Sequence, residues 1–598
     1  MTERAAHLVL TLGIVCFATP YAKSNASVTL NRLISVLLFV CVVIVGGYYF
    51  FESERLANRI ENVSPIETYD ILICTILIVL LLETVRRTVG YILLVVIAAF
   101  LLYGTLGHHL SGQMSFSQIH WSEWSEILGM TTSGILGVTT ATSTNFIFYF
   151  IVFGVVYSAV GGGQLFIDLA IKLVGQSTGG GAKVAIIGSS LMGTISGSAV
   201  ANVTSTGVFT IPLMKRTGIK PERAAAYEAI ASTGGQLMPP IMGIAAFVMA
   251  EMLATSYSNI ALAGIFPALA FYLALFVFAG LDAKKSNSGT LNNEDINSIG
   301  PILPRIHMLL PPIVLVIGLT MGYSAQIAVF WSTIVCFVAP FLNKKTHYNL
   351  RNIPMMILDS GIQSAKIAGP IIAIGIVVSV AIQSNLALKF ASGLITIGAG
   401  SSTFSLILIV LGCIIMGMGL PTVAAYIIGA VLYVPALKEL GISELQSHFF
   451  VMYFCVLSMV TPPVSLASFA AAGVAGTDSM KTSIEAFKIC AVAFLIPFAF
   501  ISDDALLFVG SYAEITIAGC GLIFSTTIWA IGVTGFAKSK ISMLGRLMMV
   551  VCGFLAMIYP TGSYIWLAAI VVSSLYLLAH FFLPACSTGM QSSCANSK

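Results

Sequence analysis

Apolar runs long enough to cross a lipid bilayer constrain this chain more than any other feature of its sequence. Hydrophobic residues make up 58% of the 598 positions and charged residues only 9%, against about 25% in an ordinary soluble domain. A helix needs ~20 apolar residues to cross a membrane, and such runs recur from 7–22 to 563–583. The sequence predicts an all-α polytopic membrane protein and excludes a soluble enzyme or a nucleic-acid-binding protein.

Basic residues set the orientation of these spans, because Lys and Arg concentrate on the cytoplasmic side of a membrane. Placing Arg86–Arg87 in the cytoplasm puts every later basic cluster inside and Asp503–Asp504 outside. The stretch 184–213 then has basic residues at both ends, which predicts a re-entrant hairpin that dips in from the cytoplasm. The same alternation makes 403–435 a second re-entrant hairpin, which enters from the outer face.

Two parts of the chain share one pattern, a hairpin followed by a helix that Pro and Gly interrupt. Ser198 in the first tip precedes Pro239 by 41 positions, and Pro421 in the second tip precedes Pro462 by the same number. Paired interrupted segments of opposite orientation indicate a secondary transporter with its site at the repeat interface. The broken helices are expected at 224–250 and 449–473. The plainer alternative, that each Pro-Pro pair only kinks a packed helix, is disfavoured by four interruptions at matched spacing.

The interruptions supply groups that can bind an ion and a carboxylate at membrane depth. Freed carbonyls with Ser, Thr, Asn and Gln oxygens suit a hard cation, and amides at half-helix N-termini suit a carboxylate. The predicted sodium-site residues are Ser196, Gly197, Ser198, Asn202, Gly234, Gly235, Gln236, Pro239, Gly417, Gly419, Pro421, Thr422, Thr461 and Pro462. The predicted substrate contacts are Ser198, Asn202, Gln236, Thr422 and Thr461.

The residue types at these positions also bear on the coupling ion. No Asp, Glu or His lies within the tips or the Pro-Pro breaks, and Glu228 is placed near the cytoplasmic end of its helix, about two turns before Gly234. Because a proton relay in a membrane usually relies on such residues, we expect sodium as the coupling ion and no cofactor. The run Gly179–Lys183 lacks the spacing and the Ser or Thr of a P-loop, so no ATP is expected.

Five stretches around the tips and breaks resemble one family of membrane proteins. Gly193–Val203, Phe209–Arg216 and Ala231–Pro240 resemble the large permease subunit of tripartite ATP-independent periplasmic (TRAP) transporters, and Gly417–Tyr426 and Thr461–Val464 resemble its second half. The likeness is greatest to the TAXI branch, in which the small and large membrane subunits are fused. It covers roughly residues 5–505.

This resemblance implies an elevator-type, sodium-coupled importer in the bacterial inner membrane. A periplasmic TAXI-type solute-binding protein would deliver a small anionic solute, an organic acid or amino acid. Residues 1–106 would correspond to the small subunit and 107–505 to the large one, with 506–598 as additional C-terminal helices and tail. The expected partners are the binding protein, the solute and the lipid bilayer, with no nucleic acid and no ATP. The family usually has one more helix before 7–22 and its N-terminus inside, whereas our orientation places residues 1–6 outside.

Two other classes of membrane protein are alternatives to a transporter. A membrane-embedded enzyme would need a buried dyad such as His with Asp, or two converging carboxylates, and the sequence offers no such pattern. An ion channel would need a repeated pore segment, which the sequence also lacks. We therefore predict a secondary importer and no enzymatic activity.

Overall fold

The structure, a computed structural model, describes residues 1–20, 28–286, 290–297, 299–344, 346–398 and 401–582, and most of them are helical. Ten helical stretches within these residues are long and apolar enough to cross a membrane, which confirms the predicted polytopic helical fold. Part of two predicted segments, 21–22 of the first span and 583–598 of the C-terminal tail, lies outside the described residues.

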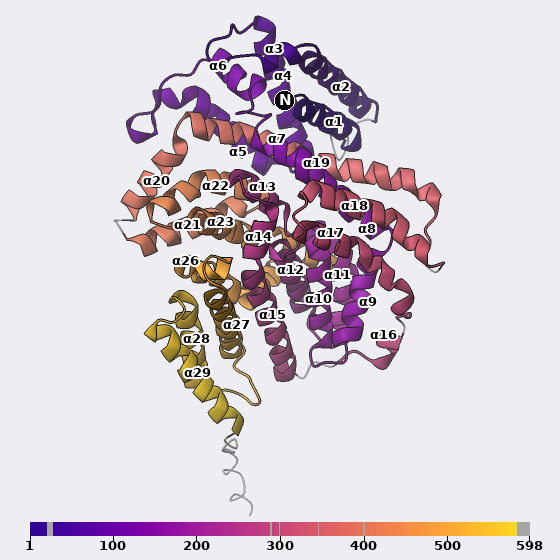
Figure 1. Cartoon of the computed structure of the whole chain (residues 1–598), viewed down its shortest axis with the longest axis vertical. Coiled ribbons are helices and arrows are strands. Elements are labelled where there is room, and N and C mark those ends of the chain that lie inside the picture. Colours follow the sequence, from indigo (N-terminus) through magenta and orange to yellow (C-terminus); the bar gives the residue numbers. More distant parts are fainter. Residues whose placement is uncertain (21–27, 287–289, 298, 345, 399–400, 583–598) are drawn as a thin grey trace, which may run out of the picture.

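The N-terminal helices form a layer at the top of the molecule (Figure 1). We call this the N-terminal layer, and its helices are α1 (Thr2–Ala18), α2 (Val28–Phe51), α3 (Ser53–Ala57), α4 (Thr68–Thr88) and α5 (Tyr91–Leu106). The long helix α19 (Ile353–Gln383) crosses beneath it and contacts α1, α4 and α5. Arg4 also donates a hydrogen bond from Nη1 to the carbonyl of Leu136 at 2.9 Å. The layer is therefore joined to the rest of the chain through packing and a hydrogen bond.

The first repeat contains a helix hairpin and an interrupted helix, and its hairpin lies at the lower right of Figure 1. Its elements are α10 (Gly180–Ser196), α11 (Ala199–Arg216), α12 (Pro221–Gly234), the 3-10 turn η5 (Gly235–Leu237) and α13 (Ile244–Met252). Gly197 ends α10 with φ of +62°, a conformation that glycine adopts without strain. Ser198 then caps α11, because its Oγ accepts a hydrogen bond from the amide of Ala201 at 3.4 Å.

The second repeat has the same order of elements, and α21, α22 and α23 lie on the left of Figure 1. They are α21 (Ser402–Gly417), α22 (Thr422–Glu439), α23 (Glu444–Leu457), the 3-10 turn η9 (Ser458–Val460) and α24 (Leu466–Ala475). Gly419 makes the turn at the tip with φ of +78°. Helix pairs lie at 184–213 and 403–435, and helix interruptions lie within 224–250 and 449–473, where the sequence predicted them. That the hairpins are re-entrant stays a prediction.

The open end of the first hairpin lies where basic residues gather. Gly179, just before α10, lies against Ala279 near the end of α15 (Ile265–Ser286). Arg223, in the first turn of α12, pairs with Asp282 of the same end of α15 at 2.7 Å. Helices α10 and α12 therefore both start from the basic end of α15.

The open end of the second hairpin lies toward the opposite end of α15. Gln446, in the first turn of α23, donates a hydrogen bond to the carbonyl of Phe500 at 2.7 Å. A short segment leads from there to Phe508, whose ring lies against that of Phe266 with centroids 5.1 Å apart. Phe266 is the second residue of α15. The two hairpins are therefore inverted relative to each other, in agreement with the charge pattern.

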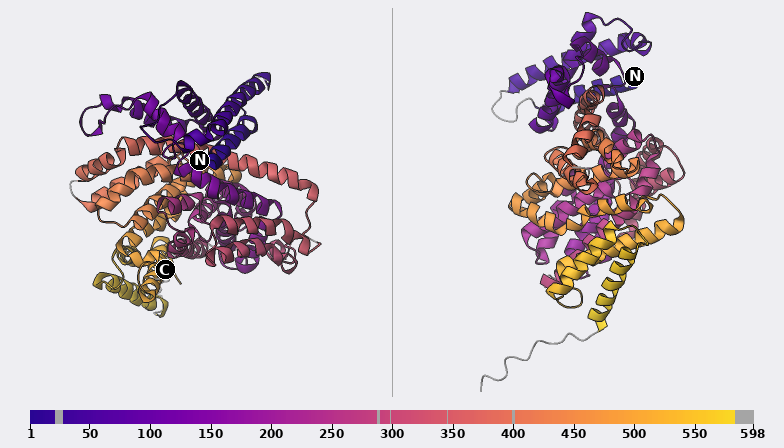
Figure 2. Two further views of the ribbon diagram at one scale, coloured as in Figure 1. Left: turned by 45° about the horizontal axis from the view of Figure 1, so that its top comes forward. Right: turned by 90° about the vertical axis from the view of Figure 1, so that its left-hand side faces the viewer.

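The remaining helices connect and surround the two repeats. Before the first repeat lie α6 (Trp121–Ser125), α7 (Val138–Thr142), α8 (Phe148–Ala159) and α9 (Gly162–Val174). Between the repeats lie α14 (Tyr257–Ala263), α15, α16 (Asn293–Asn297), α17 (Leu310–Thr320), α18 (Ala325–Val338), α19 and α20 (Leu386–Ile397). After the second repeat come α25 (Ser479–Ile489), α26 (Ile496–Ser502), α27 (Tyr512–Thr534), α28 (Met543–Ile558) and α29 (Tyr564–Phe582). Helix α27 packs on α15, and Figure 2 shows the last three helices at the end of the molecule remote from the N-terminal layer.

The inverted arrangement predicts that the two open ends are reached from opposite sides of the membrane. Lys220, between α11 and α12, and Glu444, at the start of α23, are both exposed. With the basic end inside, a membrane-impermeant maleimide should label E444C in intact spheroplasts and K220C only in inverted vesicles. The unmodified chain, with its exposed Cys520, gives the background. Labelling of both variants from the same side would contradict the arrangement.

Candidate functional site

The tip of the first hairpin lies against the break in its own repeat. A methyl group added to Gly197 would lie 3.4 Å from the side chain of Ile244 and 3.9 Å from the carbonyl oxygen of Met242, at the far end of the break. Further along the hairpin, a methyl group on Gly193 would lie 2.6 Å from the Cα of Gly235. Because the two backbones meet there without room for a side chain, hairpin and interrupted helix are packed as one unit.

Two buried oxygen atoms beside this contact have no hydrogen-bond partner within the described part of the chain. They are Oγ of Ser196 and Oδ1 of Asn202. Asn202 is fully buried, and its Nδ2 donates a hydrogen bond to the carbonyl of Ser189 at 2.8 Å. A buried oxygen without a donor costs free energy, and a bound cation would satisfy it.

The second hairpin meets its own break through different side chains. Gly417, the last residue of α21, lies directly against the side chain of Ser458 in η9. A methyl group on Gly419 would lie 3.7 Å from Val464 in the break and 2.5 Å from Ile92 of α5. The second tip therefore contacts both its own repeat and the N-terminal layer.

The two breaks lie side by side, since η5 contacts α23 and η9 contacts α12. Each contains a Pro-Pro pair joined by a cis peptide, Pro239–Pro240 and Pro462–Pro463. The carbonyl of Gln236 accepts a hydrogen bond from the amide of Gly243 across the first break at 2.7 Å. Helices α13 and α24 begin just beyond the breaks, so their N-terminal amides lie near the carbonyl ends of η5 and η9. Carbonyl ends suit a cation, and amide ends suit an anion.

The structure places every predicted site residue at a tip or a break. Ser196, Gly197, Ser198 and Asn202 lie at the first tip, Gly234, Gly235, Gln236 and Pro239 at the first break, Gly417, Gly419, Pro421 and Thr422 at the second tip, and Thr461 and Pro462 at the second break. Some have evident structural contacts: Gly234 packs against the ring of Phe271, and Thr461 Oγ1 donates to the carbonyl of Leu457 at 2.8 Å. Their roles as ligands stay predictions.

Sequence reasoning missed the surroundings of Glu228. Its side chain is fully buried and accepts four hydroxyl hydrogen bonds. The donors are Ser189 on α10 at 2.7 Å, Thr206 and Thr210 on α11 at 2.5 Å each, and Ser232 on α12 at 3.0 Å. The spacing of four between the two threonines, and between Glu228 and Ser232, was the one available signal.

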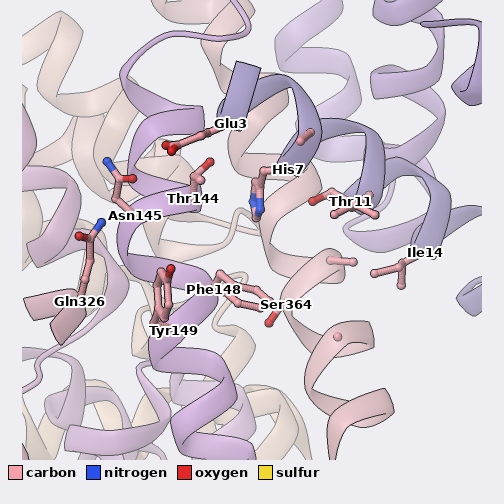
Figure 3. Close-up of a pocket in the computed structure, with 14 residues that line it drawn as sticks. Glu3, His7, Thr11, Ile14, Thr144, Asn145, Phe148, Tyr149, Gln326 and Ser364 are labelled. Atoms are coloured by element: carbon pink, nitrogen blue, oxygen red, sulfur yellow. The ribbon is translucent and has the colours of Figure 1, made fainter. Parts of the chain in front are cut away.

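A separate cavity of about 620 Å³ lies between α1 and the helices beneath it (Figure 3). Glu3 and His7 of α1 face Asn145 and Tyr149 across it, and Nε2 of His7 lies 2.9 Å from the hydroxyl of Ser143. The predicted ion and substrate residues do not line this cavity. It is therefore distinct from the site at the tips and breaks.

Residues 76–515 match the family described as the tripartite ATP-independent periplasmic transporter, DctM component. This match covers most of the chain and includes both hairpins and both breaks. The chain belongs to this family. It is a multi-pass permease of the inner membrane and the membrane component of a secondary transporter, not an enzyme.

Curated relatives agree with this assignment. The C4-dicarboxylate TRAP transporter large permease protein DctM of Pseudomonas aeruginosa is 25% identical over 334 residues, which are 55% of this chain and 76% of the relative. The 2,3-diketo-L-gulonate TRAP transporter large permease protein YiaN of Escherichia coli is 23% identical over 369 residues, 60% and 84% of the two chains. The isethionate TRAP transporter permease protein DctMQ of Oleidesulfovibrio alaskensis is 26% identical over 349 residues, 56% and 53%. The predicted TRAP family is confirmed, and the TAXI branch stays a prediction.

The backbone contact between Gly193 and Gly235 predicts an intolerant position in the permease. In G235A the new methyl group would lie 2.5 Å from the Cα of Gly193, and overpacking of this kind lowers stability by about 1–3 kcal/mol. The control is G473A in α24, where a methyl group meets no atom within 4 Å and the higher helix propensity of Ala is mildly stabilising. Thermal unfolding of both purified variants measures the difference. Equal midpoints for G235A and the unmodified permease would show that the two helices separate easily.

Proposed function

We propose that the permease imports a small organic acid together with sodium, and receives it from a TAXI-type periplasmic solute-binding protein. The observation that carries this is the pair of unpartnered buried oxygens, Ser196 Oγ and Asn202 Oδ1, at the contact between the first tip and the first break. Neutral oxygen ligands suit a hard monovalent cation. Among the described residues, no group of three or more His, Cys, Asp or Glu side chains is placed to hold a metal ion.

An anionic solute is supported by two independent features. The relatives are named for C4-dicarboxylates, 2,3-diketo-L-gulonate and isethionate, each of which carries a carboxylate or sulfonate. In the permease, α13 and α24 begin at the breaks, and the amides of a helix N-terminus favour an anion. An amino acid also carries a carboxylate and belongs to the same class of solute.

Transport would follow an elevator movement of the two repeats against a fixed part. The contact of Gly193 with Gly235 and that of Gly417 with Ser458 hold each hairpin to its interrupted helix. The fixed part would consist of residues 1–106, which we assign as the small-subunit part, together with α19. The large-subunit region would end near 505. The contact between Gly419 and Ile92 would then break and re-form during each transport cycle. Of the helices after 505, α27 packs on α15, and together they would extend the large-subunit region.

The proposed coupling predicts which gradient drives uptake. The permease would be reconstituted in proteoliposomes, with the binding protein outside and labelled succinate, isethionate and glutamate as probes. An inward sodium gradient should drive uptake of the accepted probe, and a protonophore should leave it largely intact. Liposomes without the binding protein are the control. Uptake driven by a pH gradient in sodium-free buffer would contradict sodium coupling.

The unpartnered hydroxyl of Ser196 is predicted to be a sodium ligand, and it can be removed by mutation without loss of packing. In S196A the loss of one oxygen ligand should weaken sodium binding by about 1–3 kcal/mol, or about 5- to 150-fold. The matched control is S190A on the same helix, because Ser190 already donates to the carbonyl of Ile187 at 2.8 Å. The sodium concentration for half-maximal uptake measures both. If Ser196 only faces the protein interior, S196A should instead be neutral or slightly more stable, with an unchanged sodium curve.

A further inference from the structure

The carboxylate of Glu228 is fully buried, where an ionised group costs free energy. It is not among the residues predicted to bind the ion or the solute. Its two oxygens accept hydrogen bonds from hydroxyls on all three helices of the first repeat that meet there, α10, α11 and α12. Hydrogen bonds from hydroxyls stabilise the charged form of a carboxylate and oppose the cost of burying it. Ionisable groups inside membrane proteins are rare and usually functional.

The second repeat shows that hairpin packing alone does not require this charge. With Ser198 aligned on Pro421, the counterparts of Ser189, Thr206, Thr210, Glu228 and Ser232 are Gly412, Gly429, Tyr433, Val451 and Cys455. The pair that corresponds to Thr206 and Glu228 also meets in the second repeat. A methyl group on Gly429 would lie 2.9 Å from Cγ1 of Val451, and one on Gly412 would touch the hydroxyl of Tyr433. The same architecture therefore forms with a valine in place of the glutamate.

The cluster around Glu228 connects directly to Asn202, the residue with the unpartnered oxygen. The hydroxyl of Thr206 lies 2.5 Å from Oε1 of Glu228 and 2.8 Å from the carbonyl oxygen of Asn202. The hydroxyl of Ser189 donates a hydrogen bond to Glu228, and the carbonyl of Ser189 accepts one from Nδ2 of Asn202. One layer of hydroxyl groups therefore separates the buried charge from the amide that borders the first break.

We propose that Glu228 is the fixed counter-charge of the first cation site. It is a positioning residue that does not touch the ion: its negative charge acts across the layer of Ser189 and Thr206 and favours a cation beside Asn202, because charges interact over longer distances in a poorly polarisable interior. The second repeat has no counterpart, so the first site binds sodium more tightly than the second and fills first. This inference rests on the proposed sodium coupling.

The test is the sodium-dependent stabilisation of the full permease in detergent, measured as the unfolding midpoint during titration with NaCl at constant ionic strength in choline chloride. E228Q keeps the shape and the ability to bond hydroxyls and removes only the charge. It should need about 10-fold more sodium for half of the stabilisation, equivalent to about 1.4 kcal/mol. The unfolding midpoint of E228Q in choline chloride without sodium should not fall. The control is E251Q, at the end of α13 outside the cluster, which should titrate like the unmodified permease.

Two further variants keep the outcome clear. E228D retains the charge, and the sodium concentration that gives half of its stabilisation should stay within about 3-fold of that of the unmodified permease. E228V introduces the residue that the second repeat has at this position, and it should need as much sodium as E228Q. If E228Q does not fold, E228V takes its place in the test. An unchanged sodium titration for E228Q or E228V, with or without a lower midpoint in choline, would reduce Glu228 to a packing role and overturn the inference alone. An unmodified permease that sodium does not stabilise would overturn both the inference and the proposed coupling.

Discussion

The structure depends on one constraint, the need to shield interrupted backbone from lipid. A membrane interior offers no water to satisfy free amides and carbonyls, and the permease contains two helices that Pro pairs interrupt. Each interruption is covered by the tip of the hairpin that precedes it in the chain, Gly197 at Met242 in one repeat and Gly419 at Val464 in the other. Because the two breaks also lie beside each other, the free polar groups of the backbone collect in one place. The residues predicted to bind ion and solute lie at that place.

The two repeats share their backbone design but differ in chemistry. Close packing is preserved, with Gly193 against Gly235 in the first and Gly417 against Ser458 in the second. Behind that contact, the first repeat buries a carboxylate among hydroxyls, and the second buries Val451. Since the second repeat keeps its contact without a cluster of hydroxyls and a carboxylate, the residues behind the contact were free to diverge in charge. The two proposed cation sites would therefore differ in electrostatics although the fold is symmetric.

The sequence predicted the irregular elements well because their signals are local or lie at element ends. Pro pairs mark the breaks, and the basic residues at the ends of 184–213 mark the hairpin that the structure has at α10 and α11. Tertiary contacts carry no such signal. The burial of Glu228 depends on which face of α12 meets the hairpin, and its distance from Gly234 along the chain predicted only a place near a helix end. The contact of Gly419 with Ile92 joins segments far apart in the sequence, and neither residue indicates the other.

The proposed coupling of ion and solute would depend on the same unsatisfied groups. Without an ion, Asn202 Oδ1 is a buried acceptor without a donor, so the closed contact of tip and break is less stable than it could be. A ligand that binds the closed form better shifts the equilibrium toward it by its differential affinity. With Glu228 ionised, the first sodium brings the net charge of its site to zero, and a second sodium would offset the charge of a monoanionic solute. A unit of low net charge crosses the apolar interior of the fixed part at the lowest electrostatic cost, so movement would require sodium and solute together.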